Sequence, residues 1–506
     1  MFLRVIDDFL NAITMYRLVV YGLILLFCVG LLYSFFGLLA FTPFAILLSL
    51  VLLLVSCYVT NSIFSKIFKA PTNVESWIIT SFILFFIFTP ANSPTDYLFL
   101  SLCGFIAMAS KYILAINRKH IFNPAAISAV ISGFLGFGAS WWVGSSIFAP
   151  VTVIIGLLIV RKIRRFRLFF SFVITATITI LAFGLVNKLP IFDLTIQIFT
   201  SWPLWFFATI MLTEPLTTPP TRRLQTLYGI LVGLLFGSPL TFGFVSTTPE
   251  FALVVGNLFS FLLSPHTKLI LTLKEKISIA RNLYEFSFIS NQKLDFLPGQ
   301  YLEWTLPHKS VDSRGNRRYF TIASSPTEEN IKLGVKIFEN SSSFKTALMS
   351  LDKGTRLTAS QLSGDFTLPK DSNKKLVFIA GGIGVTPFRS MIKYLLDKSE
   401  KRDIVLFYIN KTAEEIVFKE IFDEAFRKLD IKTVYVLTDK ENIPKGWKGR
   451  VGHLGGDIIR KDVFDFRERI FYISGSHSMT ESLKEILKGI EVSDNQIKTD
   501  YFPGYA

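Results

Sequence analysis

Long apolar runs fill the first half of the chain, whereas short alternating runs fill the second half. A helix that crosses a membrane needs about 20 mostly apolar residues, because the bilayer offers its backbone no water to bond. Ten runs are candidates, at residues 18–36, 44–63, 77–89, 97–110, 125–142, 147–160, 168–186, 198–212, 227–244 and 251–263. The pattern predicts a polytopic α-helical membrane domain of about ten helices over residues 1–265.

The basic residues of this half test the helix count, since Lys and Arg near helix ends stay on the cytoplasmic side. With ten helices, 14 of the 15 Lys and Arg residues in 1–265 fall on one face, and only Lys188 falls on the other. We therefore expect a multi-pass protein of the cell membrane, surrounded by lipid, with both termini and the whole second half in the cytoplasm. Residues 1–17 are interpreted as an interfacial helix.

The pattern of hydrophobic and polar residues changes after residue 266. Short alternating strands such as LYEFSFIS, with PGQY between them, predict an antiparallel β-barrel over residues 266–370. From residue 371 to 506, strands alternate with helical patterns, which predicts an α/β domain with a parallel sheet and crossover helices.

Composition narrows the functional classes. The chain is 51% hydrophobic and carries a net charge of +15. The apolar half excludes a purely soluble enzyme. The basic residues of the apolar half are placed by membrane topology, and those of the second half are dispersed along the sequence. Neither half therefore predicts a nucleic-acid partner. The three cysteines, Cys28, Cys57 and Cys103, lie inside apolar runs without metal-ligand spacing, and no metal site is expected.

Two polar strings in the apolar half are candidates for a binding site. NRKHIFNPAA and MLTEPLTTPPTRRLQTLYG place Pro, Thr and Asn at helix ends. Interrupted helices of this kind are tolerated at membrane depth only inside a protein, where they aim backbone N–H groups at a polar or anionic ligand. Ordinary cytoplasmic loop ends are the alternative interpretation.

At these strings the chain resembles the NqrB/RnfD family, the flavin-carrying membrane subunits of sodium-pumping NADH:quinone reductase and of the Rnf complex. The resemblance implies a flavin between the helices, with pocket candidates Asn123, Pro124, Thr213, Glu214, Pro215, Thr217 and Thr218. The family attaches FMN to a threonine in an S-G-A-T string, which this sequence lacks. A noncovalent FMN or riboflavin and a pocket that has lost its cofactor are the alternatives.

The sharpest motif of the second half is GGIGVTP, which follows an apolar strand and opens a helix. Glycines let the backbone approach a pyrophosphate, the helix N-terminus offers unpaired N–H donors, and proline suits the first helical turn. The motif predicts a dinucleotide site at Gly381, Gly382, Gly384, Thr386 and Pro387.

A second motif is RRYFTIASSP, in which one strand brings together a cation, an aromatic ring and a hydroxyl. A flavin nucleotide needs all three. The candidates are Arg318, Tyr319, Phe320 and Thr321. Alternation places Arg318 and Phe320 on one face and Thr321 on the other unless the strand bends.

The two motifs in this order resemble the ferredoxin–NADP reductase family, in which an FAD-binding barrel precedes a nicotinamide-binding lobe. The resemblance implies that Arg318 contacts the FAD pyrophosphate, Phe320 the isoalloxazine and Thr321 its reactive nitrogen. Ser341, Ser342 and Ser343 resemble a second phosphate-binding turn.

The string YISGSHSM resembles the family's motif beside the nicotinamide, with Ser474 where that family has cysteine. Thr321 and Ser474 are thus the candidate catalytic positions, and Gly475 and Met479 are further cofactor candidates. Tyr505 is a candidate to stack near the flavin, with C-terminal packing as the alternative.

The choice between NADH and NADPH depends on Asp439, which follows the strand TVYVL. A carboxylate there repels a 2′-phosphate and suits a ribose hydroxyl, so we favour NADH.

The preferred interpretation is a membrane-bound NADH-dependent flavoprotein that passes electrons through FAD to a flavin or quinone of the membrane domain, with an outer-face acceptor and accessory electron-transfer proteins left open. One alternative makes the helices an anchor for a cytoplasmic-face quinone or flavin reductase. Another makes them a flavin transporter or binding module coupled to reduction.

Overall fold

The computed structural model describes residues 6, 9–10, 13–68, 74–116, 119–242, 245–263, 269–312, 315–338 and 341–501. The chain divides into two compact units, Met1–His266 and Thr267–Ala506. We call them the helical unit and the reductase unit. Of the candidates named above, Tyr505 lies outside the described residues, as does most of 1–12.

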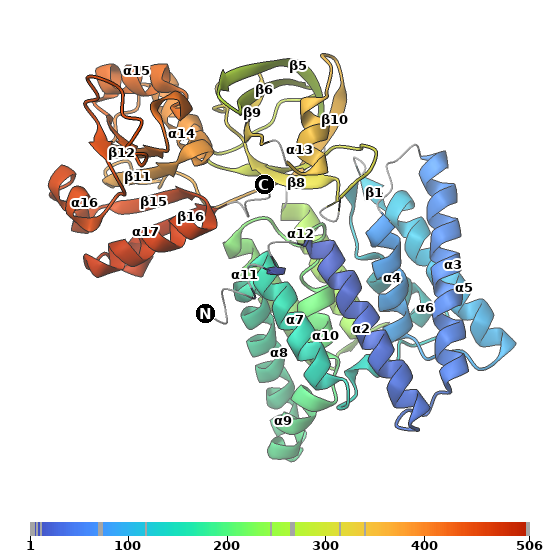
Figure 1. The fold of residues 1–506 in the computed structure, drawn as a ribbon. Helices are drawn as coiled ribbons and strands as arrows, with labels where there is room; N and C mark the ends of the chain where they lie inside the picture. The colour runs from blue at the N-terminus through green and yellow to red at the C-terminus, as the bar shows by residue number, and fades with distance from the viewer. Residues whose placement is uncertain are drawn as a thin grey trace. The chain divides into compact units, whose positions relative to one another are not determined.

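Helices lie side by side in the helical unit (Figure 1). In chain order they are α2 (Met15–Phe35), α3 (Pro43–Ile67), α4 (Val74–Ile87), α5 (Pro94–Ile113), α6 (Pro124–Phe134), α7 (Ala149–Ile163), α8 (Phe166–Val186), α9 (Ile191–Thr200), α10 (Leu204–Phe206), α11 (Arg222–Gly237) and α12 (Pro249–Leu263). Two-stranded hairpins, β1 (Ala115–Ile116) with β2 (Lys119–His120) and β3 (Thr241–Phe242) with β4 (Val245–Ser246), interrupt the helices.

The prediction of ten membrane-spanning helices is wrong in its count. In the described part of the chain, four helices are long and apolar enough to cross a membrane, namely α2, α3, α5 and α8. A fifth span results if α9 and the segment Leu204–Met211, which meet at a 52° bend, are taken together. The other apolar runs do form helices, but these are short, and α6 ends at Phe134 where residue 142 was expected. Hydropathy alone does not register such breaks.

Capping residues explain where the helices begin. Ser93 and Asp96 form a reciprocal capping box at the start of α5, and Pro94 takes the first helical position. Asn123 caps α6 by accepting from the N–H groups of Ala125 and Ala126, both at 3.1 Å. The NPAA string is thus the start of a helix.

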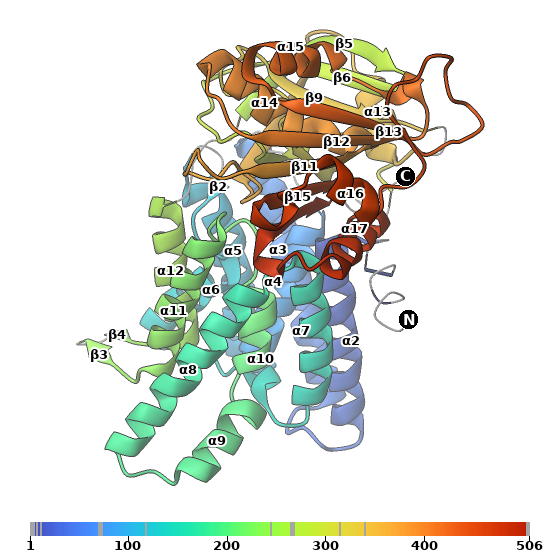
Figure 2. The same cartoon turned by 90° about the vertical axis from the view of Figure 1, so that its left-hand side faces the viewer.

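Glycines bring α8 and α11 into backbone contact. A Cβ on Gly229, Gly233 or Gly237 would lie 2.9 Å from a carbonyl oxygen of α8, that of Leu168, Phe172 or Ala176 in turn. Because the spacing is four residues on both helices, the glycine edge of α11 packs along the backbone of α8, and small side chains such as Ser171 lie at the contact. Figure 2 shows the two helices side by side.

A short π-helix, η2 (Phe207–Met211), continues α10 and is entirely buried. A π-helix carries one residue more per turn than an α-helix, and such segments are common at functional sites. The loop that follows η2 contains Thr213 and Glu214. The interrupted region that the sequence predicts is therefore a π-segment followed by a loop.

The reductase unit begins with a six-stranded antiparallel sheet in the order β8-β7-β10-β5-β6-β9. Its strands are β5 (Leu269–Ala280), β6 (Leu283–Ser290), β7 (Tyr301–Thr305), β8 (Arg317–Thr321), β9 (Ile331–Lys336) and β10 (Arg356–Ser363), with α13 (Ser343–Met349) before β10. The N–H of Ala323, just past β8, donates to the carbonyl of Lys332 in β9 at 2.9 Å. This bond joins the two ends of the sheet.

A parallel sheet follows, in the order β14-β13-β12-β11-β15-β16. Its strands are β11 (Leu376–Gly381), β12 (Ile404–Asn410), β13 (Lys432–Leu437), β14 (Arg450–Val451), β15 (Ile470–Gly475) and β16 (Ile497–Tyr501). The main crossover helices are α14 (Thr386–Lys398), α15 (Lys419–Leu429), α16 (Gly456–Asp462) and α17 (His477–Gly489) (Figure 2). An antiparallel sheet followed by a parallel sheet is the architecture that the sequence predicts for this half.

Candidate functional site

The parallel sheet reverses its strand order at β11, which pairs with β12 on one side and β15 on the other. Ligands of such sheets bind where the order reverses, beyond the carboxyl ends of the strands. The nucleotide loop, by which we mean residues 381–387, leaves β11 at that point. Ser474 and Gly475 end β15 beside it, and a Cβ on Gly384 would lie 2.5 Å from the Ser474 carbonyl oxygen.

The nucleotide loop fits a dinucleotide. Gly382 has a φ of +52°, and nothing lies within 4 Å of the place where its Cβ would be, so its backbone faces open space. Pro387 lies in the first turn of α14, and within the described chain no side chain caps that turn. Its N–H groups can therefore receive a phosphate. The Ser474 hydroxyl is fully buried and has no hydrogen-bond partner among the described residues, as expected for a group that meets a ligand.

The flavin motif lies on β8. Arg318 is buried, with its guanidinium carbon 5.3 Å from the ring centre of Phe344, and Phe320 lies 5.8 Å from the same ring, centre to centre. Thr321 points to the opposite face of the strand, is 3% exposed, and its hydroxyl lacks a hydrogen-bond partner in the described part of the chain. A buried cation, a ring and an unsatisfied hydroxyl on one strand fit a flavin nucleotide. Phe344 was not predicted, because a phenylalanine in an amphipathic helix carries no motif.

The three serines before α13 already serve local structure. Ser341 accepts from the N–H of Phe338 at 2.8 Å, and Ser342 caps α13 through the N–H of Lys345. Ser343 accepts from the N–H of Asp312 at 3.0 Å. Their hydroxyl oxygens thus accept backbone hydrogen bonds that shape the turn, and the O–H groups of Ser341 and Ser342 are still able to donate to a phosphate. Tyr319 is 44% exposed and turned away from Phe320 along the strand.

The two motifs are joined by direct contacts between their segments. Arg389 of α14 donates to the carbonyl of Ala323 at 3.1 Å and forms a two-pronged ion pair with Glu328. Ser390 donates to the carbonyl of Ser324 at 2.6 Å. Residues 323–328 follow the flavin motif, and α14 begins at the nucleotide loop. This pairing could not be predicted from the sequence, since neither Arg389 nor Glu328 belongs to a motif.

Asp439 lines an open cavity of about 590 Å³ at the outer end of the same sheet. Lys411, Lys440 and His453 line it as well. The Asp439 carboxylate accepts from the Asn442 amide at 2.9 Å, a bond that lowers the pKa of Asp439 below its ordinary value. The carboxylate is thus ionised near neutral pH, beside three basic side chains.

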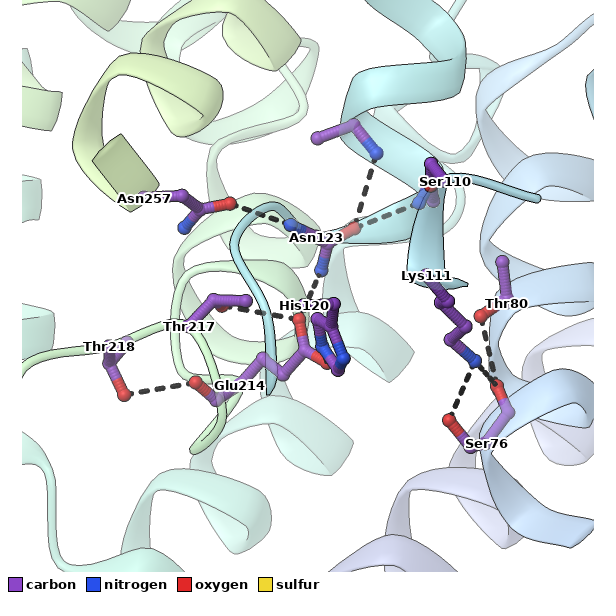
Figure 3. Close-up of polar contacts among 12 residues, drawn as sticks. Ser76, Thr80, Ser110, Lys111, His120, Asn123, Glu214, Thr217, Thr218 and Asn257 are labelled. Carbon is purple, nitrogen blue, oxygen red and sulfur yellow. Dashed lines mark hydrogen bonds and ion pairs between the residues drawn. The ribbon is translucent and has the colours of Figure 1, made fainter. Parts of the chain in front are cut away.

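A second constellation lies in the helical unit (Figure 3). We call His120, Asn123, Glu214, Thr217 and Asn257 the polar cluster. The Asn123 amide donates to Glu214 Oε2 at 2.8 Å, and the Thr217 hydroxyl donates to the same oxygen at 3.2 Å. The backbone N–H of Asn123 donates to Asn257 Oδ1 at 2.7 Å. His120 Nε2 lies 3.7 Å from Glu214 Oε1.

The structure brings the two polar strings together, as the predicted pocket requires. Arg165 holds the second string by donating to the carbonyl of Thr213 at 3.2 Å and to the hydroxyl of Thr218. Asn257, Arg165 and His120 were not predicted as site residues. Asn257 could have been found, because it is a lone amide in an otherwise apolar helix, and a polar residue there is a functional candidate.

Comparison with known proteins identifies the reductase unit. Residues 378–485 match the family described as oxidoreductase NAD-binding domain. The glycine betaine monooxygenase reductase subunit of Chromohalobacter salexigens is 24% identical over 207 residues, which are 40% of this chain and 55% of that protein. The stachydrine N-demethylase reductase subunit Stc4 of Rhizobium meliloti is 26% identical over 234 residues, which are 45% and 65% of the two chains. The chain therefore spans only part of the length of these relatives.

Among solved structures, the cytochrome b5 reductase domain of Ulva prolifera nitrate reductase aligns with a TM-score of 0.42 and 22% identity, covering 47% of this chain and 98% of that one. The resemblance of the helical unit to the NqrB/RnfD family stays a prediction. The matched segment contains the whole nucleotide loop and the end of the strand with Ser474. The match and these relatives bear out the predicted class of the second half, an NAD(P)H-dependent oxidoreductase that uses FAD.

Proposed function

We propose that the protein is a membrane-bound, NADH-dependent flavoprotein oxidoreductase that delivers electrons from the reductase unit to a quinone or flavin held by the helical unit. The observation that carries the proposal is the direct contact between the segment after the flavin motif and the helix that begins at the nucleotide loop. Four apolar helices on the same chain are compatible with a membrane anchor.

FAD would supply the chemistry of the exchange, since it accepts two electrons together and can release them singly. The chain's own residues bind and orient. The nucleotide loop and α14 would hold the pyrophosphate of NADH, and the Ser474 hydroxyl would face its nicotinamide. Arg318 would hold the FAD pyrophosphate, while the Thr321 hydroxyl would bond the flavin ring. Asp439 would favour NADH over NADPH.

The relatives give a second candidate function. The named reductase subunits belong to a monooxygenase and a demethylase. A reductase of this kind would pass electrons to a separate acceptor protein at the cytoplasmic face, and the helices would serve as an anchor. The polar cluster favours the first candidate, because an anchor has no need of a half-buried carboxylate and imidazole between its helices.

Inverted membrane vesicles separate the candidates. With NADH added outside and a membrane-impermeant electron acceptor trapped inside, transmembrane transfer reduces the trapped acceptor. Vesicles that oxidise NADH with ferricyanide but leave both the trapped acceptor and membrane quinone oxidised would contradict the proposal and support the anchor. Flavin released by acid from purified protein provides an independent count, since two flavins per chain indicate one in each unit.

A further inference from the structure

The Glu214 carboxylate in the polar cluster has two oxygens with different surroundings. Oε2 accepts two hydrogen bonds, from the side chains of Asn123 and Thr217. Oε1 faces His120 Nε2 across 3.7 Å, which is an ion-pair distance rather than a hydrogen bond. The side chains of His120 and Glu214 are 13% and 19% exposed. His120 Nε2 is buried and has no hydrogen-bond partner among the described residues.

A purely structural role explains only half of this arrangement. Oε2 ties the loop after η2 to the start of α6, and that role needs a hydrogen-bond acceptor but no charge. It does not explain a buried imidazole nitrogen left without a bond beside the second oxygen, because buried polar atoms are nearly always satisfied. A titratable pair with a loose contact of this kind is characteristic of sites where a proton moves.

The charged groups around Glu214 come from several elements. Besides His120 they are Lys111 of α5 and Arg165 before α8, which bonds the carbonyl of Thr213. The neutral phenol of Tyr228 in α11 also lies nearby and receives a bond from the Asn257 amide. Burial by itself raises the pKa of Glu214, but His120 and Lys111 outweigh burial and lower it. Glu214 is thus ionised at neutral pH, and its Oε1 faces the imidazole of His120.

We propose that His120, whose Nε2 faces Glu214 Oε1 across 3.7 Å, is the proton donor for a quinone reduced at the polar cluster. The proposal rests on the function proposed above. Overall, NADH, one proton and the quinone yield NAD⁺ and the quinol. The two electrons come from NADH, and two protons reach the quinone oxygens through His120, one of them released by NADH and one taken from water. His120 regains a proton after each transfer.

Three variants of the full-length protein test the proposal, and each keeps the hydrogen-bonding capacity of the residue it replaces. They are His120→Gln, Glu214→Gln and, as matched control, Glu250→Gln. Glu250 is likewise a buried carboxylate of the helical unit, but it accepts from the indole N–H of Trp141 at 3.0 Å and lies outside the polar cluster. Each is assayed with NADH and ferricyanide, an acceptor that takes electrons without protons, and with NADH and a short-chain benzoquinone.

We expect His120→Gln and Glu214→Gln to keep ferricyanide reduction within about twofold and to lose at least about tenfold in kcat for the quinone, the low end of general-acid catalysis. The pH dependence of quinone reduction should flatten in both. Quinone binding, measured without NADH by quenching of tryptophan fluorescence, should stay within about threefold of the wild type. Glu250→Gln should match the wild type throughout.

Two failures are distinguishable. A wild type that reduces ferricyanide but neither a benzoquinone nor a flavin bound to the helical unit overturns the proposed function, and this inference with it. A wild type that reduces benzoquinone, with both variants retaining its rate and pH profile, overturns the inference alone. Should Glu214→Gln fail to fold, His120→Gln decides the question, because the His120 Nε2 atom makes no hydrogen bond in the described chain and its replacement costs little stability.

Discussion

The nucleotide loop is formed mainly by backbone atoms, whereas the polar cluster is formed mainly by side chains. The loop consists of seven consecutive residues and works through its backbone, since Gly384 lets β15 approach and Gly382 adopts a positive φ. The cluster consists of side chains from distant segments, with Asn123 and Glu214 separated by 91 residues and Asn123 and Asn257 by 134. A site made of backbone leaves a contiguous glycine signature, whereas a site made of side chains leaves scattered polar residues.

The largest effect is expected at Gly384. A valine there would place its Cβ 2.5 Å from the Ser474 carbonyl oxygen, and this backbone atom cannot move without displacing β15. We expect Gly384→Val to lower the NADH:ferricyanide rate by at least about 100-fold, since a small misplacement of bound reactants is costly. Gly354→Ala, outside the nucleotide loop, is the control, because its Cβ meets open space and only the positive φ costs about 1 kcal/mol. Equal activity of Gly384→Val and wild type would contradict a backbone-built site.

The pairing of Arg389 with Glu328 should show the next largest effect. Arg389→Met leaves the mostly buried Glu328 carboxylate without its guanidinium, with only Lys332 and the N–H of Ser325 beside it. We expect a loss of about 3 kcal/mol in the free energy of unfolding of the reductase unit. Chemical denaturation followed by flavin fluorescence measures this loss. Lys419→Met, which removes an exposed ion pair with Asp423, should cost less than about 1 kcal/mol.

The same pair predicts a dependence on pH. Burial raises the pKa of Glu328, but the neighbouring Arg389 lowers it further, to below the ordinary 4.5. The pair therefore stabilises the unit fully above pH 4.5 and loses its effect as the pH falls through the lower pKa of the folded state. The difference in unfolding free energy between the wild type and Glu328→Gln should shrink over that acid range. If this difference in unfolding free energy did not change with pH, the stabilisation would come from packing and not from the charge of Glu328.

In the polar cluster we expect a smaller effect from Asn123→Ala. The change removes the cap of α6 and the donor to Glu214, which together contribute about 2–3 kcal/mol. The melting temperature of the helical unit in detergent should fall. The NADH:ferricyanide rate of the reductase unit should stay within about twofold of the wild-type rate. Asn187→Ala, an exposed asparagine at the end of α8, is the control and should leave melting unchanged.

The smallest expected effect concerns the nicotinamide nucleotide. Asp439→Ser removes the carboxylate that would face a 2′-phosphate beside Lys411 and Lys440. We expect kcat/KM for NADPH relative to NADH to rise about tenfold, which corresponds to 1.4 kcal/mol or roughly one charge contact. Glu441→Gln, which changes another acid of the same cavity, should shift the ratio less. An unchanged ratio in Asp439→Ser would remove Asp439 from the choice of nucleotide.

The same difference between a backbone site and a side-chain site explains how much could be predicted from the sequence. The glycine loop and the alternating strands are local, so GGIGVTP and the order of the two sheets could be identified from consecutive residues. The helix count failed because hydropathy averages over breaks such as the 52° bend before Leu204. The partners of Glu214 could not be identified, since nothing local in the sequence pairs position 214 with position 120 or position 123.

In the π-segment η2, the number of residues sets the direction of the loop that follows, independently of which residues they are. Each α-helical residue turns the chain by about 100°, as 3.6 residues per turn require. Deleting one residue from Phe207–Met211 could restore an α-helix without exposing any apolar side chain, but it would rotate the loop after it by about that angle. Glu214 would then point away from His120. Single-residue deletions in η2 would thus change the direction in which the Glu214 carboxylate points, while the residue type and its apolar surroundings stay the same.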